Sequence, residues 1–291
     1  MENKIKLFKA SHFLLLFPVL LLFNCYEDVD YSGYLRSTDR VNDRFVQSNE
    51  WNKNHPLKNL VVNTDNYQVL VAADNHIGGV TNFKLMLEAS KKTGNAAFVL
   101  VGDIVTGKKD DYLVFKNLLP NIDEVPYFLM VGNHDLYYDG WKLYYDYFGT
   151  TTYYFSIQTP TAKDIFICLD SGGGTLGNKQ LAWLKNILTT ERDVYRNCIV
   201  FTHVNFFRNR HTGSTNLLVP EINVLLDLFV HYCVDMVITG HDHIPFVHVF
   251  GNTTYITLAA LADFDRNASY LKLGINEGKA GYEFISLQPI K

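Results

Sequence analysis

The chain has 291 residues, a length typical of one or two domains, and the composition of an ordinary globular protein. Hydrophobic residues make up 47%, charged residues make up 19%, and the formal net charge is −4. This mildly acidic balance lacks the basic footprint of a nucleic-acid-binding protein, so we expect no nucleic-acid-binding surface.

The first 25 residues have the pattern of a secretion signal. Three lysines precede an eleven-residue apolar stretch, 13–23, which is shorter than the roughly 20 residues of a membrane-spanning helix. The stretch runs into Leu22-Phe23-Asn24-Cys25, which resembles a bacterial lipobox, although Asn24 stands where a small residue is usual. We therefore predict a lipoprotein signal peptide over 1–25, lipidation of Cys25 and a membrane-anchored protein on the periplasmic side or the cell surface. The alternative is an incidental thiol beside an uncleaved anchor.

A polar stretch follows the signal. Residues 26–60 contain few aliphatic side chains, and we expect a tether there, with one short helix around 40–51. The remaining cysteines lie in or beside apolar runs without CxxC spacing, which predicts buried, inert thiols rather than disulfides. Residues 61–291 are then expected to form a single catalytic domain.

From residue 67 onward, short apolar runs alternate with amphipathic stretches. Runs of four or five apolar, largely β-branched or aromatic residues predict buried strands. These runs lie at 67–73, 98–101, 127–131, 165–169, 198–202 and 236–239. Helices are expected at 82–92, 110–119, 178–188 and 222–232, and β-hairpins over 246–288. This alternation predicts an α/β fold with a mixed sheet.

Five of the runs end directly before side chains that can bind a metal ion. These side chains are Asp74 and His76, Asp103, the group Asn133, His134 and Asp135, then His203, and finally His241 and His243. In α/β folds, ligands gather outside the carboxyl ends of strands. A lone histidine after an apolar run is more often a core residue, but five of the ten histidines lie at such positions. The sequence therefore predicts one metal-binding cluster.

The order Asp-x-His, Gly-Asp, Gly-Asn-His-Asp, His and Gly-His-x-His over residues 74–243 resembles the calcineurin-like metallophosphoesterase superfamily. The resemblance implies a four-layer α/β/β/α sandwich of two mixed sheets, with a dimetal site at the carboxyl ends of the strands. It also implies a dimetal-dependent hydrolase that cleaves a phosphomonoester or phosphodiester by attack of a metal-bridging hydroxide. The alternative is a non-catalytic metal-binding surface lipoprotein. Thr106 stands where purple acid phosphatases carry Tyr, which disfavours that subclass.

The resemblance further implies a role for each residue of the cluster. The metal ligands would be Asp74, His76 and His243 for one ion, Asn133, His203 and His241 for the other, and Asp103 as the bridge. Asn133 would also contact the substrate. These donors suit Mn, Fe and Zn alike, so we expect two divalent or trivalent ions without a preference among the three.

Two further residues would act beside the ions. His134 matches the family's non-ligand catalytic histidine, which would stabilise the phosphoryl group or protonate the leaving oxygen. Asp135 would orient its ring, or else be a solvated turn residue.

The loop after His203 is rich in cations. Arg208, Arg210 and His211 follow a strand end that should lie beside the metals. Such loops often carry binding residues, and Arg can form paired hydrogen bonds with phosphate oxygens. We therefore expect these three residues to bind the phosphoester substrate. The alternative is a solvated loop.

Overall fold

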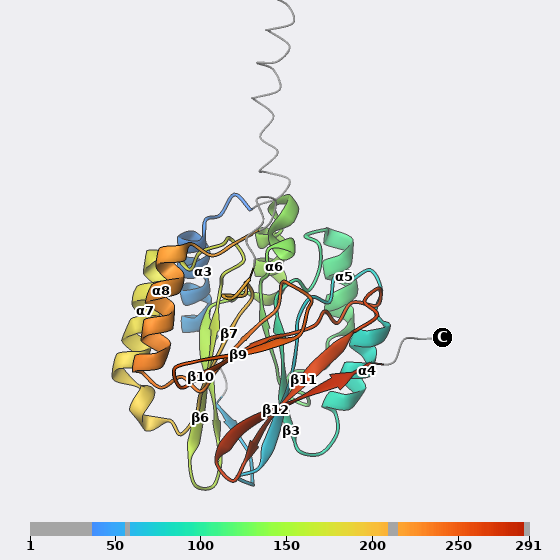
Figure 1. Cartoon of the computed structure of the whole chain (residues 1–291). Coiled ribbons are helices and arrows are strands. Elements are labelled where there is room, and N and C mark those ends of the chain that lie inside the picture. Colours follow the sequence, from blue (N-terminus) through green and yellow to red (C-terminus); the bar gives the residue numbers. More distant parts are fainter. Residues whose placement is uncertain (1–36, 56–58, 209–214, 288–291) are drawn as a thin grey trace, which may run out of the picture.

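The structure is a computed structural model that describes residues 37–55, 59–208 and 215–287 (Figure 1). The predicted signal peptide and its lipidation site, Cys25, lie outside the described residues, as do Arg210 and His211.

One sheet has seven strands in the order β1-β5-β6-β7-β8-β10-β9. Its strands are β1 (Leu60–Val61), β5 (Tyr153–Gln158), β6 (Lys163–Leu169), β7 (Cys198–Thr202), β8 (Met236–Thr239), β10 (Thr253–Thr257) and β9 (Phe246–Phe250). Strands β6, β7 and β8 are parallel, whereas β9 and β10 form an antiparallel hairpin. Strand β10 is also parallel to β8, so the sheet is mixed and β6, β7, β8 and β10 end at the same rim.

The other sheet has five strands in the order β12-β11-β2-β3-β4. Its strands are β12 (Lys279–Ser286), β11 (Ser269–Asn276), β2 (Tyr67–Ala72), β3 (Asn95–Val101) and β4 (Tyr127–Met130). Strands β2, β3 and β4 are parallel, and the β11–β12 hairpin extends the sheet in antiparallel fashion. Both hairpins expected over 246–288 are confirmed.

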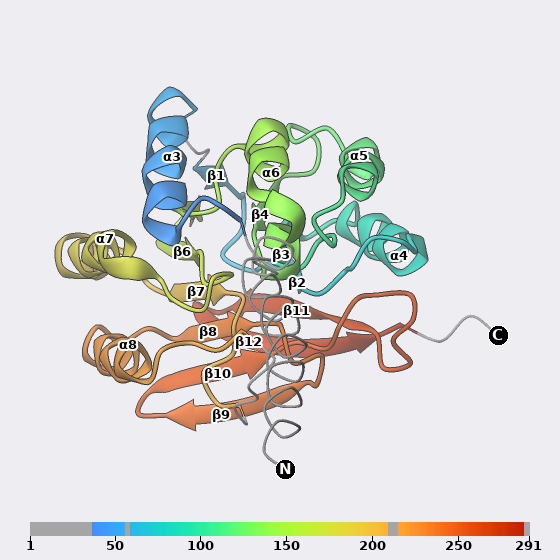
Figure 2. The same cartoon turned by 90° about the horizontal axis from the view of Figure 1, so that it is seen from above.

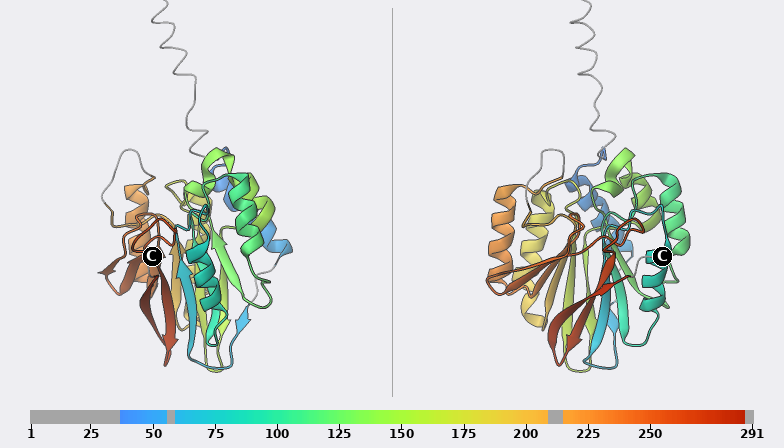
Figure 3. Two further views of the ribbon diagram at one scale, coloured as in Figure 1. Left: turned by 90° about the vertical axis from the view of Figure 1, so that its right-hand side faces the viewer. Right: turned by 45° about the vertical axis from the view of Figure 1, so that its right-hand side comes forward.

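Helices cover the outer faces of both sheets. Helices α4 (Thr81–Ser90), α5 (Lys109–Leu118) and α6 (Trp141–Phe148) belong to the five-stranded side. Helices α7 (Gly177–Thr190) and α8 (Val219–His231) cover the seven-stranded sheet. Figure 2 and the right-hand view of Figure 3 show the sheets between these two groups of helices. Alternate strand residues such as Val69, Val99, Phe155 and Phe201 fill a buried core between the sheets. This is the predicted α/β/β/α sandwich.

No helix in the described ranges is long and apolar enough to cross a membrane.

The segment expected to be a tether is folded where the structure describes it. The short helix expected around 40–51 is α3 (Val41–Asn54), which packs against α7 and β5. Its Arg44 is 3% exposed and pairs with the equally buried Asp170 (Nε to Oδ2, 2.7 Å). The tether prediction is therefore wrong for residues 41–54, because polar residues on this helix find partners in the domain that a sequence pattern does not display.

The predicted burial of the cysteines holds for two of the three described ones. Cys168 and Cys198 are buried in strands, whereas Cys233 is exposed. Cys233 lies in the turn after α8 with a φ of 48°, so the apolar run around it does not reach the core at this position.

Candidate metal centre

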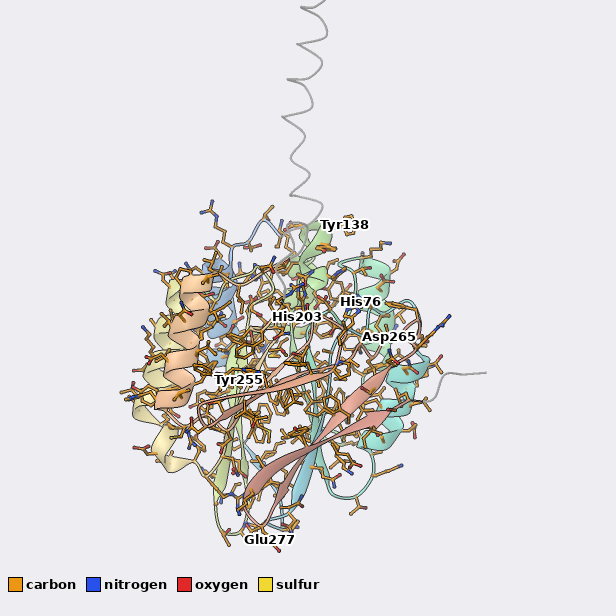
Figure 4. The ribbon with its side chains drawn as sticks, viewed as in Figure 1. His76, Tyr138, His203, Tyr255, Asp265 and Glu277 are labelled. Atoms are coloured by element: carbon orange, nitrogen blue, oxygen red, sulfur yellow. The ribbon has the colours of Figure 1, made fainter. Side chains whose placement is uncertain are left out.

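The carboxyl ends of β2, β3, β4, β7 and β8 meet at one rim of the sandwich. The Asp74 amide donates to the Gly102 carbonyl (3.0 Å), and the Gly240 amide donates to the His203 carbonyl (2.9 Å), so neighbouring strand ends are joined by backbone hydrogen bonds. In Figure 4, His76 and His203 lie toward the end of the sheets that carries Tyr138, away from Glu277 at the opposite end. The predicted cluster therefore forms between both sheets.

The backbone turns sharply where it leaves these strands. Asp74, His76, Asp103, His241 and His243 all have positive φ, between 42° and 76°. Non-glycine residues adopt this region rarely, and such strain concentrates at functional sites. The shared conformation turns these side chains off the pleat of their strands and toward one another.

Two glycines permit the close approach of the loops. A Cβ at Gly132 would collide with the Asp103 side chain, and a Cβ at Gly240 would lie 2.5 Å from Asp74 Oδ2. Any other residue at either position would displace a predicted ligand.

The predicted ligands form two groups. Donor atoms of Asp74, His76 and His243 lie within 4.8 Å of one another, and so do those of Asp103, His203 and His241. Asp103 Oδ2 lies 3.2 Å from His203 Nε2 and 3.9 Å from His76 Nε2, so its carboxylate faces both groups. The Asn133 amide oxygen is 3.2 Å from His203 Nε2 and therefore faces the second group.

The chemistry of these donors fits metal ions. Asp74 Oδ1 is buried without a hydrogen-bond partner, with His243 Nε2 at 3.3 Å. His76 Nε2 and His243 Nε2 face each other at 3.2 Å. A carboxylate oxygen and two imidazole nitrogens converging away from water are the donor set of a transition-metal site. The residues present can therefore hold the ions that the sequence predicts.

Hydrogen bonds fix which nitrogen of two histidines faces the site. A carbonyl oxygen only accepts, so the ring nitrogen beside it carries the proton. His203 Nδ1 donates to the Val101 carbonyl (2.9 Å), and His241 Nε2 donates to the Thr215 carbonyl (3.0 Å). His203 therefore presents Nε2 to the site, whereas His241 presents Nδ1.

The charges at the site are strongly coupled. Burial would raise the pKa of Asp103, but neighbouring His203 holds that pKa well below its usual range. Burial opposes the charge of His203, yet Asp103 raises the pKa of the imidazole to about 10. Burial and the positive His203 lower the pKa of His241 to about 4. A positive charge is thus favoured beside Asp103, and a bound cation would take the place of the His203 proton.

His134 lies at the edge of this cluster. Its Nε2 is 4.0 Å from Asp103 Oδ2, and 36% of its side chain is exposed. Its ring stands between those of His76 and Tyr137, with centroids 4.7 and 4.5 Å away. Donor atoms of His134, His76 and Asp103 also lie within 4.8 Å of one another, so geometry alone gives His134 access to the ligand cluster.

Asp135 supports the site from inside the fold. It is fully buried, and its two carboxylate oxygens accept the Val105 and Gly132 amides at 2.8 Å each. Burial and the nearby Asp103 raise its pKa to about 7. The carboxylate therefore fastens two ligand-bearing loops together and is not a solvated turn residue, whereas orientation of the His134 ring stays a prediction.

Arg208 makes contacts within the protein beside the cleft. It lines the cleft, but its Nε is 2.9 Å from Asp242 Oδ1 and its Nη1 donates to the Thr215 carbonyl at 2.6 Å. Asp242 in turn accepts a hydrogen bond from Asn205 Nδ2. Sequence reasoning missed this network, although the Asp between two predicted histidine ligands was the available signal. The guanidinium therefore supports the His241 loop, and substrate binding by Arg208 stays a prediction.

The site opens into a cleft of about 1010 Å³. Asn133, His134, His241 and His243 line it on the metal side, and residues 37, 39–42 and 44 line it from the N-terminal segment. The cleft is much larger than one phosphate group, so it has room for an extended ester.

Comparison with known proteins identifies relatives of this fold. The model of the calcineurin-like phosphoesterase family matches residues 67–245. No curated protein matches the chain. A dimetal phosphatase from Danio rerio is similar in structure, with 12% identity, 76% of this chain and 97% of that chain covered, and a TM-score of 0.60.

Two further solved structures are similar. A purple acid phosphatase from yellow lupin seeds has 14% identity over 77% of this chain and 52% of its own, with a TM-score of 0.58. GAP50, the anchor in the inner membrane complex of Plasmodium, has 15% identity over 78% of this chain and 90% of its own, with a TM-score of 0.52. At these identities, the three likenesses show a shared fold.

Proposed function

The chain belongs to the calcineurin-like phosphoesterase family, and on this basis we propose that it hydrolyses a phosphomonoester or phosphodiester at a dimetal site bridged by Asp103. A dimetal phosphoesterase needs two cations close together, and one observation carries the proposal. Two convergent groups of metal donors meet at one carboxylate, which lies 3.2 Å from a histidine of one group and 3.9 Å from a histidine of the other.

The ligand residues divide between two ions in this proposal. Asp74, His76 and His243 hold one ion, Asn133, His203 and His241 hold the other, and Asp103 touches both. Bound there, two cations would supply Lewis acidity to the phosphoryl oxygens and acidify the attacking water. Mn, Fe and Zn all suit the nitrogen and oxygen donors of the site.

The surrounding residues position the ester. His134 projects into the cleft from the metal side, where its imidazole can donate a proton to the leaving oxygen. The Asn133 amide nitrogen is held by the Tyr137 hydroxyl at 3.3 Å, which keeps its oxygen turned toward His203. Asp135, Arg208 and Asp242 act through the loops that they fasten.

The purified full-length chain tests the proposal directly. We expect it to hydrolyse p-nitrophenyl phosphate or bis(p-nitrophenyl) phosphate with Mn, Fe or Zn, and to lose the activity in EDTA. Asp103→Asn should be inactive, whereas Asp193→Asn, at an exposed position in η2 (Arg192–Val194), should match the wild type. A metal-loaded protein that cleaves neither ester nor any member of a wider phosphoester panel would instead support a non-catalytic metal-binding surface protein.

We also propose that the protein is an extracytoplasmic lipoprotein anchored through Cys25. The apolar run and the lipobox-like Leu22-Phe23-Asn24-Cys25 support this assignment. Near the start of the described chain, Ser37 and Thr38 donate to Asp139 at the rim of the cleft. Ser37 follows Cys25 by twelve positions, and a chain of that length can span at most about 40 Å. An anchor at Cys25 would therefore keep the cleft close to the membrane.

A further inference from the structure

The N-terminal segment builds one wall of the catalytic cleft. Residues 37, 39–42 and 44 line the cleft together with the predicted metal ligands, although they precede the family match over 67–245. Figure 1 shows that α3, which follows this segment, lies beside α7. This wall is an addition of this chain to the matched family region, so it is a candidate for substrate selection.

Hydrogen bonds hold the wall in place. Arg44 Nε and Nη2 bond both oxygens of buried Asp170 at 2.7 and 3.1 Å. Asn42 Oδ1 accepts the amide of Lys179 in the first turn of α7 at 3.1 Å. Residues 39–44 thus have a fixed geometry toward the cleft, as a binding surface requires.

The arginines that line this cleft differ in whether their guanidinium has a partner within the protein. Arg44 pairs with Asp170, and Arg208 pairs with Asp242. Arg40 is exposed, and its guanidinium has no hydrogen bond or ion pair among residues 37–55, 59–208 and 215–287. Only its backbone is engaged: its amide donates to the Asp43 side chain (3.1 Å), and its carbonyl accepts the Asp43 and Arg44 amides (2.9 and 3.0 Å). Its charge is therefore available to a ligand.

We propose that Arg40 binds a second anionic group of the substrate, a phosphate or carboxylate remote from the phosphoryl group that is hydrolysed. This inference rests on the proposed function, because it takes the metal ligands as the site of the reacting phosphate. Arg forms short, paired hydrogen bonds with such planar or tetrahedral anions. The 1010 Å³ cleft leaves room for the atoms between the two groups.

Asp39 modulates this subsite. It lines the same wall, and its Oδ1 accepts a hydrogen bond from Gln47 Nε2 at 3.0 Å. Its negative charge next to Arg40 opposes an incoming anion, which weakens binding of the second group without abolishing it. Removing the Asp39 charge should therefore act in the opposite direction from removing the Arg40 charge.

Binding of matched small molecules tests the proposal independently of turnover. Butyl phosphate and butane-1,4-diol bisphosphate differ by one phosphate group, and 5-phosphonooxypentanoate carries a carboxylate in its place. We would titrate each into the metal-loaded full-length protein by calorimetry, using the phosphonate analogue in which a CH2 group replaces every ester oxygen, so that no probe can be hydrolysed. Arg40→Ala should weaken binding of the bisphosphate about tenfold, which is the low end for a charge-assisted hydrogen bond in an open cleft. It should change the affinity for butyl phosphate by less than about twofold.

Three variants sharpen the result. Arg40→Lys should retain part of the preference, and Asp39→Asn, which keeps the acceptor for Gln47, should tighten the bisphosphate. Lys53→Ala, at the exposed far end of α3, should leave all affinities unchanged. The proposal would be overturned if Arg40→Ala lost equal affinity for butyl phosphate and the bisphosphate. It would also be overturned if the variant lost no affinity for either the bisphosphate or the carboxylate probe.

The carboxylate probe separates the two anion chemistries. A loss confined to the bisphosphate assigns a phosphate subsite, and a loss for both assigns a general anion subsite. If no phosphoester is hydrolysed while the Arg40-dependent affinity is found, the proposed function fails and the subsite stands. If esters are hydrolysed and Arg40→Ala binds every probe as the wild type does, the subsite fails alone.

Discussion

Asp103 combines the features of a bridging ligand. It is 1% exposed, it follows β3 with a φ of 50°, and its carboxylate is shared between histidines from both sheets. The His134 amide donates to its other oxygen at 2.7 Å. These contacts leave the carboxylate a single orientation.

Asp103→Asn should lower the occupancy of both metal positions and abolish hydrolysis. The amide has the size of the carboxylate but lacks the charge that attracts two cations. Elemental analysis of the purified variant measures the metal content. Two fully occupied positions with normal turnover would contradict the bridging role.

His134→Gln should separate catalysis from metal binding. As a proton donor outside the ligand set, His134 contributes on the order of 10²–10⁴-fold to kcat, and its loss should leave metal content near the wild-type value. Substrates with acidic leaving groups should be affected less, since they need no protonation. His231→Gln, at an exposed position in α8, is the matched control. Metal loss in His134→Gln would make His134 a ligand, as its closeness to His76 and Asp103 permits.

At the scale of elements, the loop after β8 carries His241 and His243 and is supported from outside the ligand set. Arg208 bonds the Thr215 carbonyl, and the same carbonyl accepts the proton of His241 Nε2. Arg208 also pairs with Asp242, between the two histidines. One guanidinium thus braces the loop at two points.

Arg208→Ala should weaken metal binding rather than substrate binding. Loss of partners that orient metal ligands costs about 10–100-fold in affinity. Competition with a chelator measures the dissociation constant of the ion beside His241. Arg208→Lys keeps the charge but lacks the paired donors of the guanidinium. Its metal affinity should therefore lie between those of the wild type and Arg208→Ala. A higher KM with unchanged metal affinity would instead support the direct substrate contact expected from the sequence.

Helix α3 is fastened to the domain by the Arg44–Asp170 pair. Arg44→Ala leaves the Asp170 carboxylate charged and buried, which should lower the free energy of unfolding by about 3–5 kcal/mol. Denaturant unfolding measures this loss. Lys53→Ala breaks an exposed pair with Glu50 on the same helix and should change stability by less than about 0.5 kcal/mol. A loss below about 1 kcal/mol in Arg44→Ala would show that other contacts hold α3.

At the scale of the whole molecule, the cleft and the start of the described chain lie on the same face. Thr38 donates to Asp139 at 2.8 Å through both its amide and its hydroxyl, which ties the N-terminal segment to η1 (His134–Asp139), directly after the Asn133 ligand. A lipid anchor at Cys25 would turn this face toward the bilayer. Phosphoesters at or near a membrane surface would then be within reach.

Cys25→Ser should release the protein from the membrane fraction or leave it as an unprocessed precursor, because the thiol that carries the lipid is gone. Fractionation and mass spectrometry of the N-terminus measure both results. Cys233→Ser removes an exposed thiol elsewhere and should stay with the membrane. An intact Met1 without acyl mass in the wild-type protein would favour an uncleaved anchor.

The sequence predicted the features that depend on residues close together in the chain. Apolar runs predicted the strands because burial on both faces requires continuous apolar residues, and β2, β4, β7 and β8 begin where expected. The polar residues directly after each run predicted the cluster, because parallel strands deliver their ends to one rim. The residue types and their order in the sequence were therefore enough to predict the ligand set.

Only the tertiary structure decided how distant residues pair. Arg44 and Asp170 are 126 positions apart, so nothing near Arg44 in the sequence distinguishes a docked helix from a tether. Asp135 and Arg208 had side chains suited to the roles predicted for them, but their partners come from neighbouring loops that fold against them. Local patterns determine which side chains reach the rim, whereas the contacts between elements decide what each side chain does there.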